Sequence, residues 1–226
     1  METMVYKTDT EPELRQAVKA AGELLREGKL VAIPTETVYG LAANALDPQA
    51  VNAIFKAKGR PNDNPLIVHI ADLSALPDVV SVVPEKARVL MERFWPGPLT
   101  IVLPRNPQIP NETTAGLDTV AVRMPSHPVA RAVIRESGLS LAAPSANRSG
   151  KPSTTTAAHV LHDMDGRIEM ILDGGAVGIG IESTIVDMTG TIPTILRPGF
   201  ITKTMLSEIV GDVTIDPAII EPDPNL

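Results

Sequence analysis

The chain has 226 residues, of which 43% are hydrophobic and 21% charged, and this composition excludes a wholly disordered protein. The sequence contains no cysteine, which excludes disulfides, iron–sulfur clusters and cysteine-based zinc sites or nucleophiles. A formal net charge of −7 argues against a broad nucleic-acid-binding face, although a local basic pocket stays possible in an acidic protein.

The first half of the chain alternates predicted helices with apolar strands. Apolar residues at helical spacing predict a helix between a possible cap at Thr10 and a stop at Gly28. Asp47 followed by Pro48 is typical of a helix start, and this second helix is expected to end near Gly59. The other elements expected in this half are strands over 30–35, 66–72 and 99–104 and a helix over 84–94.

The same alternation continues through the second half. Strands are expected over 119–125, 139–144, 169–175, 183–188 and 194–199, and helices over 127–136, 154–164 and 202–210. Strands that are apolar on both faces and alternate with helices are typical of a sheet covered by helices. The sequence therefore predicts an α/β fold with an open, mixed sheet that is largely parallel, with antiparallel pairs among the closely spaced late strands.

The domain organisation and the location follow from the ends of the chain. We expect one catalytic domain over residues 1–210 and a C-terminal extension or the start of an interdomain linker over 211–226. The stretch "DPAIIEPDPNL" (216–226), rich in proline and acids, is expected to be extended or frayed. The N-terminus lacks the apolar region of a signal peptide, and no run approaches the roughly 18 apolar residues of a membrane span. We therefore expect a cytoplasmic protein that does not enter a membrane.

A cluster of cations follows the second predicted helix. The stretch "KAKGRPNDNPL" (56–66) places Lys56, Lys58 and Arg60 within five positions of an acidic chain. One or two cations at a helix C-terminus are explained by the negative end of the helix dipole. The third cation favours the alternative hypothesis that this loop holds an anion.

Two loops that follow strands combine hydroxyl and amide side chains. The stretch "PTETVYGLAANA" (34–45) carries Thr35, and "SANRSGKPS" (145–153) carries Ser145 and Asn147. Such residues are also common in ordinary turns, where they bond to the local backbone. In open α/β sheets, however, ligands bind beyond the carboxyl ends of the strands, where such loops converge. We therefore interpret both loops as candidate binding segments.

Three basic or titratable residues lie in apolar strand contexts. Arg123 and Arg197 need a partner there, and the alternatives are a bound anion or a structural carboxylate such as Asp187 or Asp173. His69, in "LIVHI", is either a core histidine bonded to a backbone carbonyl or a ligand contact. If the cations converge, they could neutralise a triphosphate, with Mg²⁺ carried mainly by the phosphates.

Seven short motifs, taken together, resemble a known family. They occur in the order "PTETVYGL", "KAKGRPNDNPL", "RFWPGPLT", "AVRMPSHP", "APSANRSGKPS", "STIVD" and "LRPG". In this order they resemble the YrdC-type threonylcarbamoyl-AMP synthase family over most of residues 10–210, and the family's K-x-R and S-x-N signatures match 58–60 and 145–147. The resemblance implies a YrdC-like, twisted α/β sheet with a large positively charged cavity.

The resemblance also implies an activity. Members of this family are nucleotidyltransferases that convert L-threonine, bicarbonate or CO2, and ATP to L-threonylcarbamoyl-AMP and pyrophosphate. This is the first half of threonylcarbamoyladenosine formation next to the anticodon of tRNA, so the implied partners include the tRNA-modifying proteins that use the product. The nucleophile comes from the substrates, and the absence of cysteine is compatible with that chemistry.

The site residues that the resemblance implies fall into two subsites. Threonine or its carbamate would contact Thr35, Lys58, His69, Arg123 and Ser145. The nucleotide would contact Arg60, Asn64, Asn147, Ser183 and Arg197. Within these sets, the residues expected to act in catalysis are Lys58, Arg60, Ser145 and Asn147. No metal ligand is expected from the protein, and Mg²⁺ would enter as a cofactor with ATP.

Two other functions stay open. One is a double-stranded RNA-binding module, or weaker RNA binding beside the enzymatic activity, and the other is a carbamoyl-transfer domain of the hydrogenase-maturation type. The chain also departs from the longer relatives, which carry a linker and a second C-terminal domain. It stops at Leu226, in what resembles the start of such a linker, so either a short form or a fragment is expected.

Overall fold

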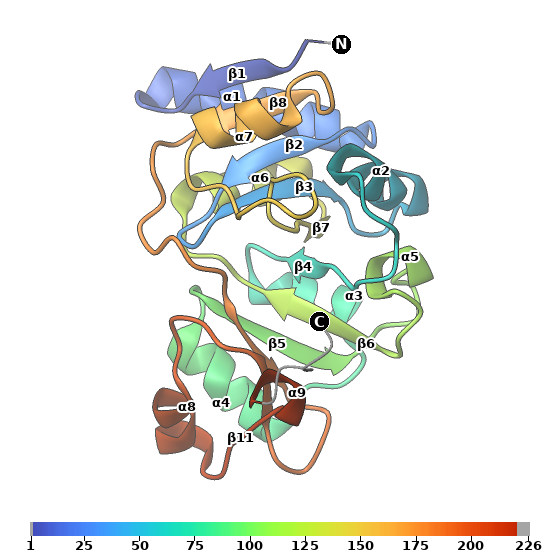
Figure 1. Ribbon diagram of the computed structural model, residues 1–226, viewed down its shortest axis with the longest axis vertical. Helices are drawn as coiled ribbons and strands as arrows, with labels where there is room; N and C mark the ends of the chain where they lie inside the picture. Colours follow the sequence, from blue (N-terminus) through green and yellow to red (C-terminus); the bar gives the residue numbers. More distant parts are fainter. Residues whose placement is uncertain (1, 221–226) are drawn as a thin grey trace.

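Eleven strands form one sheet with helices on both faces in the computed structural model, which describes residues 2–220 (Figure 1). The strands follow one another across the sheet in the order β1-β8-β2-β3-β7-β4-β6-β5-β9-β10-β11. Their bounds are β1 (Met4–Lys7), β2 (Val31–Pro34), β3 (Tyr39–Asn44), β4 (Ile67–His69), β5 (Leu99–Pro104), β6 (Thr119–Arg123), β7 (Leu141–Ala142), β8 (Met170–Asp173), β9 (Thr184–Asp187), β10 (Thr194–Arg197) and β11 (Thr214–Ile215). The helices are α1 (Glu11–Arg26), α2 (Pro48–Lys58), α3 (Leu76–Val79), α4 (Glu85–Phe94), α5 (Asn111–Thr114), α6 (Pro128–Ser137), α7 (Ala157–Met164), α8 (Lys203–Val210) and α9 (Pro217–Ile220), with a 3-10 turn at Leu73–Ala75.

The sheet is mixed, as predicted, but it is not largely parallel. Antiparallel pairs join β2 to β3, β3 to β7, β7 to β4, β6 to β5 and β9 to β10. The pair of late strands, β9 and β10, is antiparallel as expected. Five strand pairs of the described residues are antiparallel and five are parallel, and the antiparallel pairs in the middle of the sheet arise where β3 folds back on β2 and also pairs with β7. The sequence predicted that β3 would be part of a loop over residues 34–45.

Alternating side chains on the central strands enter two separate cores, one on each face of the sheet. On β2, Val31 and Ile33 join the cluster formed with α1 and α6, whereas Ala32 joins the cluster that includes α2, α4, α7 and α8. On β3, Leu41 and Ala42 divide between the two clusters in the same way. Because helices cover both faces of the sheet, the side chains on both faces of these strands are apolar. The strands therefore lack the alternation of polar and apolar residues that marks a strand with one solvent-exposed face.

The residues predicted to begin the first two helices, and to end the second, do so in the structure. The Thr10 side chain accepts from the Glu13 backbone N–H, and the Glu13 carboxylate accepts from the Thr10 N–H, which forms a capping box at the start of α1. Asp47 caps α2, with Pro48 in its first turn. Gly59 ends α2 with a φ of 68°, a conformation that suits glycine, and turns the chain into the 60–66 loop.

The C-terminal segment differs from the expected extended tail. β11 pairs with β10, Val213 is buried, and Pro217–Ile220 form a short helix, so the described part of 211–226 belongs to the fold. Residues 221–226, which complete the predicted tail, lie outside the described residues. Between residues 2 and 220, no helix combines the length and the apolar character that crossing a bilayer requires.

Candidate functional site

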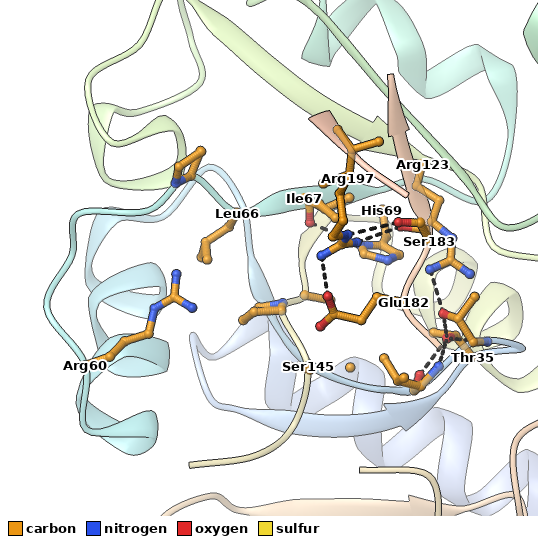
Figure 2. A pocket seen from close by; sticks show the side chains of 17 residues that line it. Thr35, Arg60, Leu66, Ile67, His69, Arg123, Ser145, Glu182, Ser183 and Arg197 are labelled. Atoms are coloured by element: carbon orange, nitrogen blue, oxygen red, sulfur yellow. Dashed lines mark hydrogen bonds and ion pairs between the residues drawn. The ribbon is translucent and has the colours of Figure 1, made fainter. Parts of the chain in front are cut away.

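A cavity of about 150 Å³ lies over the middle of the sheet, where β3, β7 and β4 are neighbours (Figure 2). Its polar lining consists of Thr35, Thr37, Arg60, His69, Arg123, Ser145, Glu182, Ser183 and Arg197. The remaining lining is made of backbone and apolar side chains, among them Val38, Leu66, Ile67, Pro144 and Ile185. Among the described residues, the lining therefore includes three guanidinium groups, of Arg60, Arg123 and Arg197, and one carboxylate, of Glu182.

The position of the cavity agrees in part with the expectation that the site lies beyond the carboxyl ends of the strands, since His69, Arg123 and Arg197 are the last residues of β4, β6 and β10. β7 and β4 are antiparallel, so their carboxyl ends point to opposite edges of the sheet. The lining includes Gly40 of β3 and Ile185 of β9, so the cavity lies across the sheet as well as at strand ends. Its volume is below the roughly 300–1,000 Å³ that is typical of small-molecule pockets, in contrast to the large cavity that was expected.

Most of the predicted site residues meet in this cavity. Seven of them line it: Thr35, Arg60, His69, Arg123, Ser145, Ser183 and Arg197. They come from segments as distant in sequence as the turn after β2 and the end of β10. Six of them lie in six of the seven motifs, and the seventh, His69, lies outside the motifs. Lys58, Asn64 and Asn147 do not line the cavity, and direct substrate contacts by these three stay predictions.

Lys58 joins the two family signatures to each other. Its ammonium group, which is buried, donates to the carbonyl oxygen of Ser145 and, over 2.8 Å, to that of Asn147. The backbone N–H of Ser149 in turn donates to the Lys58 carbonyl over 2.9 Å. Burial, and then the nearby charge of Arg60, lower the pKa of Lys58 to about 8. Lys58 thus holds the 145–149 loop by its backbone.

The two predicted asparagines lie in different surroundings. Asn147 is buried, and its amide nitrogen donates to the carbonyls of Arg148 and Lys151 over 2.9 and 2.8 Å, while its side-chain oxygen is buried without a hydrogen-bond partner in the described structure. Asn64 is exposed in the loop between α2 and β4. Asn147 therefore shapes the loop that carries Ser145, and Asn64 lies on the surface beside the cavity lining residue Pro65.

Arg60 reaches the cavity from the end of α2. Its guanidinium carbon lies 5.2 Å from the centre of the Phe55 ring, five residues earlier in the chain, and this stacking fixes the direction of the side chain. Burial lowers the pKa of Arg60, and Asp63 and Glu182 oppose that shift. In Figure 2, Arg60 lies on one side of the cavity and Arg123 on the other.

His69 is a buried neutral histidine that also lines the cavity. Its Nδ1 lies 3.1 Å from the carbonyl oxygen of Ile67, so we assign the proton to Nδ1 and leave Nε2 as an acceptor. Burial, and then the charge of Arg123, lower the pKa of His69 to about 3. The structure shows the first alternative, a buried histidine bonded to a backbone carbonyl, and a ligand contact by this cavity-lining residue stays a prediction.

Arg123 forms a buried ion pair with Glu36. Its Nη2 donates to Glu36 Oε1 over 2.6 Å, Nη1 to the Thr37 hydroxyl over 2.9 Å, and Nε to the Gly97 carbonyl over 3.2 Å. The other oxygen of Glu36 accepts from the Ser126 N–H over 3.1 Å. Burial lowers the pKa of Arg123, and Glu36 opposes that shift. This pair fastens the turn after β2 to the end of β6.

Arg197 forms the second ion pair of the site, with Glu182. Its Nη1 donates to Glu182 Oε2 over 2.6 Å, Nε to the Ser183 carbonyl over 3.0 Å, and Nη2 to the Ser183 hydroxyl over 3.1 Å. The Ser183 hydroxyl lies 2.7 Å from the hydroxyl of Thr100. Figure 2 shows Glu182 extending from this group into the middle of the cavity.

The sequence interpretation left open whether each arginine binds an anion or pairs with a carboxylate, and it named Asp187 and Asp173 in place of the two carboxylates that the structure shows. Asp187 and Asp173 do not pair with an arginine in the described structure, because they accept from backbone N–H groups of turns, Asp187 from Thr189 and Asp173 from Gly175. Glu36 lies directly after Thr35, within the first motif, and Glu182 directly before Ser183. Their position within or next to the motifs that carry Thr35 and Ser183 could have identified these two carboxylates as site residues.

A larger hollow on the surface, beside α8, has no arginine among the described residues that line it. The hollow beside α8 has about 570 Å³, but its lining of Ile192, Lys203, Ser207, Gly211, Asp212, Val213 and Thr214 includes none of the predicted residues. Within residues 2–220, no group of three histidine, aspartate or glutamate side chains could hold a metal ion. The central cavity is therefore the candidate active site, with side chains suited to binding anions.

The Sua5/YciO/YrdC family model, whose description is "Telomere recombination", matches residues 23–199. The threonylcarbamoyl-AMP synthase of Bacillus subtilis is 56% identical over 220 residues, which cover 96% of this chain and 64% of that protein. The threonylcarbamoyl-AMP synthase of Pyrococcus abyssi is 54% identical, over 89% of this chain and 59% of that protein. The chain thus spans less than two thirds of the length of these relatives.

A solved structure extends the similarity to three dimensions. The crystal structure of P. abyssi Sua5 complexed with L-threonine superposes with a TM-score of 0.93 and is 49% identical in sequence. The match covers 99% of this chain and 65% of the P. abyssi chain. The described fold and the arrangement of its motifs are therefore those of a characterised structural family.

Proposed function

Because the chain belongs to the Sua5/YciO/YrdC family, we propose that it is a threonylcarbamoyl-AMP synthase. It would convert L-threonine, bicarbonate or CO2, and ATP to L-threonylcarbamoyl-AMP and pyrophosphate, as a nucleotidyltransferase. The observation that carries the proposal is the meeting of Arg60, Arg123 and Arg197 with hydroxyl groups in one cavity. Such a site suits a reaction between two anions, a carbamate and a triphosphate.

The two substrates would occupy different parts of the cavity. Threonine would lie near Thr35, His69 and Ser145, and the phosphates near Arg60 and Arg197, since these two guanidinium groups are the less enclosed cations of the lining. Threonine bound to the P. abyssi relative supports the amino acid as a substrate. The nucleotide and bicarbonate follow from the reaction named for the relatives.

The chemistry requires positioning and charge stabilisation. The threonine amine adds to CO2 and loses one proton, which yields a carbamate. A carbamate oxygen then attacks the α-phosphorus, the bond to the β-phosphate oxygen breaks, and pyrophosphate leaves with the electron pair. Arg60 and Arg197 would stabilise the charge on the phosphates, and His69, neutral at physiological pH, adds no further positive charge near the amine.

Mg²⁺ would be held mainly by the phosphates of ATP, and it would neutralise part of their charge. The product is an activated carbamoyl group, which tRNA-modifying proteins would transfer to the base next to the anticodon. A cytoplasmic location would bring the chain together with these proteins and with tRNA.

Pyrophosphate release in the presence of ATP, threonine and bicarbonate, with each omitted in turn, tests the proposal. We expect release to require all three, and the product to have the mass of threonylcarbamoyl-AMP. Arg197→Ala should weaken ATP binding more than threonine binding in calorimetric titrations. Equal loss of both, with a lower thermal midpoint, would assign Arg197 a structural role.

The same assays separate the two other functions. An RNA-binding module would bind duplex RNA with a steep dependence on salt and would release no pyrophosphate. A carbamoyl-transfer domain would accept carbamoyl phosphate in place of threonine and bicarbonate. Either result would overturn the proposed synthase activity.

A further inference from the structure

The two ion pairs of the site differ in their exposure. The side chains of Arg123 and Glu36 are 4% and 14% exposed, whereas those of Arg197 and Glu182 are 31% and 35% exposed. Both pairs have the same short separation of 2.6 Å. An ion pair that keeps contact with solvent exchanges partners at a lower cost, because each separated charge can be solvated. The Arg197–Glu182 pair is therefore the exchangeable one.

The surroundings of Arg197 hold the guanidinium in place independently of Glu182. Two of its nitrogens donate to Ser183, and the Ser183 hydroxyl is itself fixed by the buried hydroxyl of Thr100. Glu182, in contrast, has a second partner of its own, since Oε1 accepts from the Ser153 hydroxyl over 3.0 Å. If the contact between Glu182 and Arg197 breaks, the arginine stays directed into the cavity and the carboxylate keeps one hydrogen bond.

We propose that Glu182 is a built-in competitor for the phosphate site at Arg197, which an incoming phosphate group displaces. The inference rests on the proposed function, since it assumes that the anion is a phosphate of ATP or pyrophosphate. A carboxylate oxygen at 2.6 Å occupies the position that a phosphate oxygen takes in a charge-assisted hydrogen bond. As long as Glu182 is in the cavity, its charge also repels a second anion.

The competitor accounts for the small volume of the cavity and predicts faster release of the leaving group. The cavity is small because the pair of Arg197 and Glu182 extends into it, and displacement of Glu182 toward Ser153 would enlarge it. Competition from Glu182 also lowers the affinity of the site for pyrophosphate. This favours turnover, because pyrophosphate must dissociate from Arg197 before the next ATP binds. Glu182 returns to the arginine when pyrophosphate leaves, and this return accelerates release.

Glu182→Gln tests the proposal, because glutamine keeps the size of the side chain and an oxygen for Ser153 but removes the charge. ATP and pyrophosphate are titrated separately into the wild type and the variant in a calorimeter. We expect both ligands to bind about tenfold more tightly to the variant, the effect of removing one charge-assisted contact that competes with them. Threonine affinity should change less than twofold. In steady state, KM for ATP and kcat should both fall.

Glu208→Gln is the matched control. Glu208 is exposed on α8, so its replacement changes the net charge by the same amount at a position away from the cavity, and ligand affinities should stay at wild-type values. In a background with Arg197→Gln, the effect of Glu182→Gln should disappear, since the competition requires the arginine. If Glu182→Gln does not fold, as judged from its thermal midpoint, Glu182→Ala is used with the same expectations.

Unchanged or weaker binding of ATP and pyrophosphate by a folded Glu182 variant would overturn the competitor role. That result would leave the synthase activity intact, provided that the wild type still releases pyrophosphate when all substrates are present. Failure of the wild type to bind either ATP or pyrophosphate would instead overturn the proposed function, and the competitor role with it.

Discussion

Lys58 and Arg60 lie two residues apart in one signature, but the fold uses their charges differently. The Lys58 ammonium binds backbone carbonyls of the 145–149 loop, whereas Arg60 faces the cavity. Lys58→Met should therefore lower the free energy of unfolding by about 2–3 kcal/mol, because buried carbonyl groups lose their donor. Turnover should fall as well, since the position of Ser145 depends on this loop. Urea denaturation measures the first effect and pyrophosphate release the second, and hydrogen exchange of residues 145–151 reports on the order of the loop.

Arg60→Ala should reduce turnover strongly and stability only slightly. Turnover should fall roughly ten- to a hundredfold if the contact acts in the transition state, while loss of the stacking on Phe55 costs only about 0.5–1 kcal/mol. Lys56→Ala is the control, since Lys56 is exposed in the same helix turn and does not line the cavity. If Arg60→Ala and Lys56→Ala have the same turnover, Arg60 has no part in catalysis.

His69 makes the stability of the protein depend on pH in the acidic range. The pKa is about 3 in the folded protein and about 6.5 in the unfolded chain, so between these values the unfolded chain binds the extra proton. The contribution is fully present above about pH 6.5 and is lost as the pH falls toward 3, by about 1.4 kcal/mol per pH unit. His69→Gln should remove this slope. Urea denaturation of both proteins from pH 6.5 to pH 4 measures it, and equal slopes would contradict a buried neutral His69.

The sequence predicted which residues lie in the site better than it predicted the role of each residue. Seven predicted residues line the cavity, and six of them lie in the motifs, which mark the segments from which they come. The use of Lys58 as a backbone clamp could not be predicted, since it depends on the approach of the loop at Asn147 from far along the chain. Glu36 and Glu182 were missed because the carboxylates considered as partners for the arginines were Asp187 and Asp173, and the pairing of Arg197 with Glu182 and of Arg123 with Glu36 depends on the fold.

At the scale of elements, the end of α2 determines where Arg60 points. Gly59 adopts a φ of 68°, and an added Cβ there would meet no atom within 4 Å, so Gly59→Ala introduces backbone strain without a clash. We expect a loss of about 1 kcal/mol of stability and a fall in turnover, because the turn into the catalytic loop changes.

Gly138→Ala provides the comparison. Gly138 ends α6 with a φ of 67° and equal open space, but α6 lies in the core cluster with α1 and away from the cavity lining. The stability loss should be similar, and turnover should stay at the wild-type value. Thermal midpoints and pyrophosphate release of the two variants are measured together, and equal turnover would show that the direction of the loop is not set by Gly59.

Elements with strong periodicity or caps were predictable, whereas β3 was not, although it is as long as β5. β5 has the predicted bounds, 99–104, and α4 differs by one residue at its start. β3 was expected to be a loop because it follows a polar turn and contains Gly40, yet its side chains are buried. Gly40 is needed there because an added Cβ would lie 3.3 Å from that of Ala143. Such a close approach between strands leaves no local signal in the sequence.

At the scale of the whole molecule, the sheet extends beyond the predicted catalytic domain. β11 pairs with β10, which carries Arg197, and Val213 is buried beside it. A chain that ends at Gly211 should lose about 2–4 kcal/mol of stability, the order expected for removing a buried apolar side chain and a strand pairing. It should also bind ATP more weakly. Unchanged stability and affinity would place the end of the domain at residue 210, as the sequence suggested.

The strand order has a consequence for synthesis on the ribosome. β1 lies at one edge of the sheet and pairs with β8, so Met4 meets Met170 across nearly the whole length of the core domain. Translation adds roughly 5–20 residues per second, and the first strand therefore waits on the order of ten to thirty seconds before its neighbour exists. During that interval β2 and β3 can already form their hairpin, while the nascent amino terminus, with Val5 on its surface, stays available to chaperones.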